Sequence, residues 1–198
     1  MGWISGLVCS GLVALAAVVF VVIVYNGLVR ARNACRNAFA QIDVQLTRRH
    51  DLIPNLVETA KGYLKHERAT LDTVVRARTA AVSAQSAVAG GTGDLAAIGL
   101  LAGAENVLSQ ALGQMFALAE AYPDLKANQN MLRLQEELTT TENRVAFARQ
   151  AYNDAVLTYN TRRQVFPSSL IAGIFSGQPA QLFEIDDPQQ RQTPNVSF

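Results

Sequence analysis

The two histidines of the chain, His50 and His66, are the side chains best suited by type to metal or acid-base chemistry. The run HERAT, which starts at His66, begins like the zinc-protease motif His-Glu-x-x-His, in which two histidines one helical turn apart bind the metal. Thr70 stands where the second histidine is needed, so a zinc ion would find one ligand instead of two. The Glu-x-x-His pairs of two-metal sites in helical bundles do not occur either. We therefore predict no metal ligand and no bound cofactor.

Other catalytic patterns are missing from the sequence as well. It contains no Gly-x-Ser-x-Gly nucleophile motif, and the glycine-rich run at 90–93 lacks the lysine and the preceding strand of a phosphate-binding loop. This run is interpreted as a connector. We identify no catalytic residue, no cofactor-binding residue and no small-molecule substrate, and we expect that the protein is not an enzyme.

The densest polar cluster is the run Arg48-Arg49-His50-Asp51. One interpretation is solvated charge at a helix break or near lipid headgroups. The other is a docking site for a partner formed by these four residues. The sequence leaves both open.

Composition limits the class of protein. The chain has 198 residues, enough for one domain, and its 49% apolar and 17% charged residues are not those of a disordered chain. A formal net charge of +1 gives no electrostatic footprint for a polyanion, so nucleic acid is not expected as a partner. Cys9 and Cys35 lie in and just after one apolar run, which excludes the disulfide framework of a small secreted domain.

An apolar segment opens the chain. Residues 3–25 (WISGLVCSGLVALAAVVFVVIVY) carry no charge and exceed the roughly 20 residues that a helix needs to cross a bilayer. A cleaved signal peptide is disfavoured, because nothing basic precedes Trp3 and no small-residue cleavage site follows. We predict an uncleaved transmembrane anchor within residues 1–25, and the lipid bilayer is therefore the first partner.

The flanks of this segment predict its orientation. Arg30, Arg32 and Arg36 follow the span, whereas the N-terminal flank has only its amino group. The positive-inside rule then places the N-terminus outside and the domain after the span in the cytoplasm. The alternative is that these arginines serve only the helical domain.

A stripe of small residues lies along the span. Gly2, Gly6, Ser10 and Ala14 recur every four residues, so two such helices could approach closely along this face. Small residues are common in membrane spans in any case. The stripe nevertheless favours a homo-oligomer packed through the span.

The rest of the chain has the periodicity of helices. Apolar residues recur at intervals of 4 and 7, which indicates an amphipathic helix from about 26 to 87. They are Ile42, Leu46, Ile53, Val57, Leu64, Leu71 and Val75. This helix is broken either near 50, with Asp51 as a cap and Pro54 in a new first turn, or near 62–66 at Gly62. The sequence does not decide between the two.

Two further helices complete the domain. One is predicted from 95 to about 122, capped by Asp94, and the other from about 125 to 163, after a turn at Pro123. Short connections make neighbouring helices antiparallel. We therefore predict an all-α fold in which the transmembrane helix is followed by an up-and-down antiparallel four-helix bundle, with the domain at 26–184 and a polar flexible tail at 185–198.

In this topology the fourth helix returns toward the membrane. The apolar stretch within 166–175 is too short to span a bilayer. It is expected either to lie among lipid headgroups or to cap the open end of the bundle, and Phe183 is a further exposed aromatic candidate. The hypothetical membrane interface comprises Arg30, Arg32, Arg36, Arg162, Arg163, Ile171, Ile174 and Phe175.

Several unusual motifs resemble those of the bacterial LemA family. They are the run IDVQLTRRHDLIPNLV at 42–57, KGY at 61–63, HE at 66–67, AYPDLKAN at 121–128, LQEEL at 134–138, TEN at 141–143, AR at 148–149, YN at 152–153 and at 159–160, and FP at 166–167. The resemblance covers about 25–184. It implies a single-pass protein of the bacterial inner membrane with a helical bundle and no established catalytic residues, and a relative in magnetic bacteria is associated with organelle membrane formation.

Together these features lead to two expectations for function. The first is a membrane-anchored scaffold or interaction protein of the bacterial inner membrane that assembles with itself and takes part in membrane organisation. The alternative is an accessory subunit of a membrane protease or envelope-stress complex, with another membrane protein as its partner. An enzyme would require convergent ionisable groups in a cleft.

Overall fold

The computed structural model describes residues 2–90, 95–175 and 178–184, and in these ranges it is built of helices without a strand. The helices are α1 (Gly2–Lys61), α2 (Arg68–Gly90), α3 (Leu95–Ala119), α4 (Pro123–Lys126), α5 (Gln129–Gln164) and α6 (Ser168–Phe175). The predicted all-α architecture, with an apolar N-terminal helix and a bundle, is confirmed. Asp94, the predicted cap of α3, and the tail at 185–198 lie outside the described residues.

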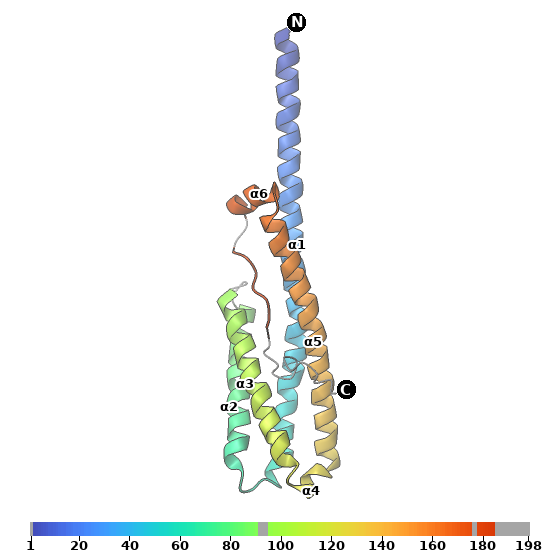
Figure 1. Cartoon of the computed structure of the whole chain (residues 1–198), viewed down its shortest axis with the longest axis vertical. Helices are drawn as coiled ribbons and strands as arrows, with labels where there is room; N and C mark the ends of the chain where they lie inside the picture. The colour runs from blue at the N-terminus through green and yellow to red at the C-terminus, as the bar shows by residue number, and fades with distance from the viewer. Residues whose placement is uncertain (1, 91–94, 176–177, 185–198) are drawn as a thin grey trace, which may run out of the picture.

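The first helix joins the apolar segment to the bundle without a break. α1 has 60 residues, and its N-terminal part projects beyond every other helix (Figure 1). At 1.5 Å per residue a helix of this length extends about 90 Å. Any orientation that the apolar part adopts is therefore transmitted directly to the bundle.

Four long helices form the bundle, arranged as two antiparallel pairs. α1 packs mainly on α5 and α2 on α3, while α1 also contacts α2 (Figure 1). Two clusters of buried apolar side chains fill the interior, one toward the end that carries α4 and one toward the end from which the N-terminal segment projects. Six of the seven predicted core positions between 42 and 75 are buried, but Val75 is 45% exposed and Val74 is buried instead.

The break in the first long segment lies at 62–67, and α1 continues through Pro54. A proline in a helix has no N–H to donate to the carbonyl four residues earlier, here that of His50. Nε of Arg78 on α2 donates to this carbonyl at 2.7 Å. The neighbouring helix thus replaces the lost hydrogen bond, which explains why α1 does not end at Pro54.

The last long helix starts later than predicted. Pro123 begins the single turn of α4, and α5 starts at Gln129 rather than near 125. Oδ1 of Asn128 accepts hydrogen bonds from the N–H groups of Asn130 and Met131, at 2.9 and 3.1 Å. This side-chain cap satisfies donors that have no partner within the helix, which fixes the start of α5.

The chain after α5 turns back into the bundle. α6 lies across the end of α5 beside α1, and residues 178–184 then run between α3 and the α1–α5 pair (Figure 1). Phe183 is fully buried in the cluster of apolar side chains toward the end from which the N-terminal segment projects. The expectation that Phe183 is an exposed aromatic was therefore wrong. Its ring belongs to one buried cluster with apolar side chains of α1, α2, α3 and α5.

Candidate membrane-interface and interaction sites

The projecting part of α1 exposes a continuous apolar surface. Large side chains on all its faces are accessible, from Trp3 at 91% to Tyr25 at 44%. Of the helices in the described ranges, α1 alone is long and apolar enough to cross a membrane. In water such exposure would be costly, whereas a bilayer removes it from solvent. This surface is compatible with a membrane anchor, and Gly6 of the small-residue stripe has open space beside it.

Basic side chains gather where the apolar surface ends. Arg30, Arg32 and Arg36 are exposed on α1. Nη1 of Arg162 on α5 donates to the Gly27 carbonyl at 3.3 Å, and the Arg163 guanidinium lies 5.9 Å from the Tyr159 ring centroid. An open groove of about 480 Å³ lies at this junction. It is lined by Ile23, Gly27, Arg30, Ala31, Ala34, Thr158 and Arg162.

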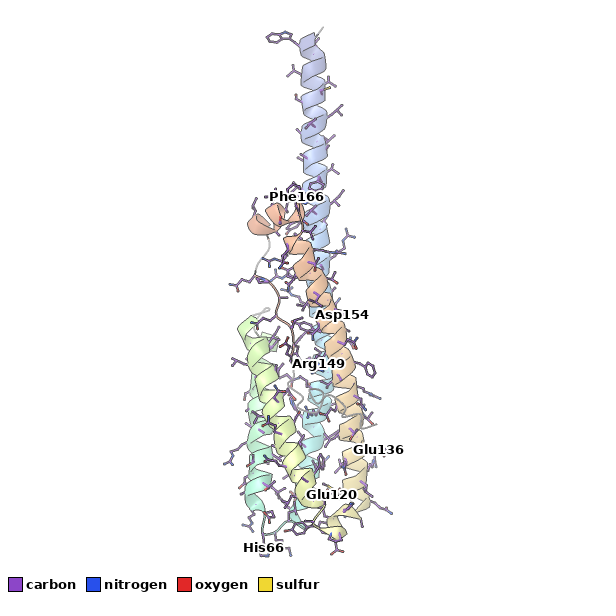
Figure 2. The ribbon with its side chains drawn as sticks, in the orientation of Figure 1. His66, Glu120, Glu136, Arg149, Asp154 and Phe166 are labelled. Atoms are coloured by element: carbon purple, nitrogen blue, oxygen red, sulfur yellow. The ribbon has the colours of Figure 1, made fainter. Side chains whose placement is uncertain are left out.

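The short helix α6 beside this junction is split between core and surface. Ile171 is buried against the bundle, so its expected place at the lipid interface was wrong. Ile174 is 75% exposed, and Leu170 and Phe166 are exposed as well. Figure 2 shows Phe166 beside α6, at the level where the apolar part of α1 leaves the bundle. The Phe175 side chain lies outside the described residues.

The four residues of the predicted docking cluster point to different sides of α1, two toward solvent and two into the bundle. Arg48 and Asp51 are exposed and remain available to a partner. Arg49 and His50 are only 4% and 2% exposed, so their expected place on a docking surface was wrong. Positions one apart on a helix point about 100° away from each other, so four consecutive residues cannot all face solvent on a packed helix.

The buried half of the cluster is held by Glu105 of α3. Its carboxylate is fully buried and accepts from Nη1 of Arg49 at 3.0 Å and from Nε2 of His50 at 2.7 Å. Nη2 of Arg49 donates to the Ser109 hydroxyl at 2.8 Å and lies 3.8 Å from a Glu142 carboxylate oxygen on α5. The cluster links α1, α3 and α5. Removing one member would leave a buried charge without compensation.

The sequence carries a signal for the buried role of Glu105. It is the single charged residue of α3, which is otherwise apolar or neutral. A lone carboxylate on an apolar helix is seldom buried unless it is paired, so it indicates a cationic partner on another helix. The sequence could have suggested a pair, but not which basic residue forms it.

Potential metal ligands are otherwise dispersed in the part of the chain that the structure describes. The described residues include no group of three or more His, Cys, Asp or Glu side chains that could hold a metal ion. His66 is exposed in the connector between α1 and α2, at the opposite end of the bundle from Phe166 (Figure 2). Both histidines therefore have structural or surface positions in this fold.

Side chains of α5 bind the main chain of residues 178–184. The Asn160 amide donates to the Ala180 carbonyl at 2.8 Å and accepts from the Ala180 N–H at 3.0 Å. The Asn153 amide makes the same pair with Phe183, at 3.3 and 2.9 Å. The Tyr152 hydroxyl donates to the Gln181 carbonyl at 2.9 Å. Burial, with a smaller contribution from nearby Cys35, raises the pKa of Tyr152 to about 12.

The sequence of the chain matches the LemA family model over residues 38–198. The chain belongs to the LemA family. Among its relatives are Magnetosome proteins MamQ 1 and MamQ 2 of Paramagnetospirillum magneticum, each 25% identical over 90% of this chain and 71% of the relative. Magnetosome protein MamQ of Magnetospirillum gryphiswaldense is also 25% identical, over 80% of this chain and 64% of the relative. Family and relatives suggest a membrane-associated helical protein.

Proposed function

We propose that this LemA family protein is a membrane-anchored scaffold of the bacterial inner membrane that assembles with itself and takes part in membrane organisation. The observation that carries the proposal is the unbroken helix α1, which couples the exposed apolar segment rigidly to the bundle. The part of α1 within the bundle, 26–61, spans about 54 Å at 1.5 Å per residue. Such a rod presents docking surfaces at a defined distance from the bilayer.

The junction of anchor and bundle supports contact with anionic lipid. Arg30 and Arg162 flank an open groove at the base of the apolar segment, with exposed Arg32 and Arg36 nearby. Basic side chains at this depth attract acidic headgroups, each contributing about 1 kcal/mol near an anionic surface. Exposed Leu170 and Ile174 on α6 would lie at the same level.

The relatives supply the link to membrane organisation, because they are named as proteins of the magnetosome. The proposed orientation places the N-terminus outside and the bundle in the cytoplasm, following the arginines after the span. Arg48 and Asp51, exposed midway along the bundle, are proposed to contribute to a docking surface for another membrane protein.

Self-assembly is proposed to use the small-residue stripe of the span, Gly2, Gly6, Ser10 and Ala14. Extraction into native nanodiscs, followed by crosslinking and native mass measurement, tests it: the expected species is a homo-oligomer. Gly6→Leu should shift it toward the monomer, whereas the control Gly11→Leu, on another face, should not. Isolation as a stable heteromer would instead favour the accessory subunit of a membrane protease or envelope-stress complex. A monomer would refute the self-assembling scaffold.

Orientation needs a separate measurement. A cysteine placed at exposed Gln150, in a chain whose Cys9 is changed to serine, should react with a membrane-impermeant thiol reagent only after cells are broken. Cys35 is buried and gives little background. Labelling of intact cells would contradict the cytoplasmic position.

A further inference from the structure

The two asparagines that bind the C-terminal segment have a spacing that matches an extended chain. Asn153 and Asn160 are seven residues apart on α5, which is about 10.5 Å along a helix. Their partners, Ala180 and Phe183, are three residues apart in an extended stretch, which covers about 10 Å. Two turns of α5 therefore have the same length as three residues of extended chain.

The recognition chemistry depends mainly on the main chain. Each asparagine amide pairs with both the N–H and the carbonyl of one residue, and the Tyr152 hydroxyl binds a third carbonyl. These groups exist in almost any peptide. Selectivity comes from the positions that face inward, where Phe183 is fully buried and Ala180 is partly buried. The side chains of Gln181 and Leu182 between them are exposed.

We infer that this α5 docking face, defined by Tyr152, Asn153 and Asn160, is a peptide-binding site whose resident ligand is residues 178–184 of the same chain. The partner that fits it is an extended segment of another polypeptide with a small residue followed, three positions later, by a buried aromatic residue. The chain's own segment competes with that partner. It therefore acts as a built-in inhibitor of docking.

The attached segment has a large concentration advantage over a free peptide. A segment attached by a short connection is present at an effective concentration in the millimolar range, so a free peptide at micromolar concentration does not displace it. Weakening the attached segment should open the site without altering α5. Phe183→Ala does so, because it removes the anchor from the ligand and leaves Asn153 and Asn160 in place.

The test uses the full chain in mild detergent and a fluorescently labelled peptide, QPAQLFE, which has the sequence of residues 178–184. Fluorescence anisotropy should show binding to the Phe183→Ala variant at least about tenfold tighter than to the wild type. Gln178→Ala is the matched control in the same segment, and it should behave as the wild type because the polar side chain of Gln178 is exposed. A peptide with alanine in place of its phenylalanine should not bind.

The contribution of the α5 docking face to peptide binding is measured in the Phe183→Ala variant, in which the attached segment is weakened. Adding Asn153→Ala to Phe183→Ala removes two hydrogen bonds to the peptide and should weaken binding about tenfold or more. Adding Gln150→Ala instead removes an exposed side-chain amide one turn earlier on α5 and should leave binding unchanged.

Three results would overturn the inference. The first is a Phe183→Ala chain with wild-type helical content that fails to bind the peptide. The second is equal binding to the wild type and the variant, and the third is binding that Asn153→Ala does not weaken. If Phe183→Ala loses helical content, Ala180→Pro takes its place, because it removes only the N–H donated to Asn160.

Discussion

Substitutions at Arg78 and Pro54 should have non-additive effects on the free energy of unfolding. The reason is that Arg78 supplies the hydrogen bond that is lost at Pro54. Pro54 leaves the His50 carbonyl without a helical donor, and Nε of Arg78 supplies one at 2.7 Å. His50 is buried, so water does not readily substitute for that donor. In the wild type, Arg78→Met keeps most of the aliphatic stem but removes the charged donor. We expect it to lower the free energy of unfolding by about 1.5–3 kcal/mol.

The Pro54→Ala background changes this result. An alanine at 54 has an N–H that can donate to the His50 carbonyl, so the same Arg78→Met change should then cost less than about 1 kcal/mol. The coupling energy of the cycle is therefore expected near 1–2 kcal/mol. Pro54→Ala alone should stabilise the chain, since Pro54 is exposed in a helix interior, where proline costs up to about 3 kcal/mol.

The cycle is measured by urea unfolding in mild detergent, followed by the helical circular dichroism signal. Arg76→Met is the matched control on α2, because the Arg76 side chain is exposed and its guanidinium donates to the Thr73 hydroxyl at 3.4 Å on the same helix. It should change stability by less than about 0.5 kcal/mol in either background. The reasoning is refuted if Arg78→Met costs the same with proline and with alanine at 54, within the roughly 0.3–0.5 kcal/mol that additive sites show.

Three further predictions concern the buried cluster, the α5 docking face and the anchor. Glu105→Ala leaves Arg49 buried without its carboxylate and should lower the free energy of unfolding by about 3–5 kcal/mol in the same assay. The control Glu58→Ala removes an exposed ion pair with Lys61 and should lower it by less than about 1 kcal/mol. Equal losses would contradict the role of the buried cluster. Because the folded pKa of Tyr152 is about 12 against an unfolded value of 10.0, its neutral phenol contributes stability that is complete below pH 10 and is lost as the pH rises toward 12. Between pH 10 and 12 the wild type should lose about 2 kcal/mol more than Tyr152→Phe, and parallel pH profiles would disprove the assignment. An alkaline carbonate wash should leave the full chain in the membrane pellet and release a chain without residues 2–25; release of both would exclude an integral anchor.

The sequence determined the features that depend on local pattern. An uncharged apolar run of 23 residues, 3–25, is sufficient to predict a helix that can span a bilayer. Apolar spacing near 3.6 residues identified the helices and most of the buried positions predicted for the first of them, including Ile42, Leu46 and Ile53. Short connections then implied antiparallel neighbours, because a chain that turns sharply has nowhere else to pack. Each of these inferences needs information from only a few turns of chain.

Only the tertiary structure decided the features that depend on residues far apart in sequence. α1 passes through Pro54 because Arg78 of another helix replaces the lost donor, and no local pattern contains that contact. Arg49 and His50 are buried because Glu105, more than 50 residues away, meets them in the core. Phe183 is buried because an extended segment returns into the core, where Asn160 and Asn153 bind residues that lie 20 and 30 positions after them. Local pattern sets which face of each helix is apolar, whereas the partner of a buried polar group depends on how the helices are assembled.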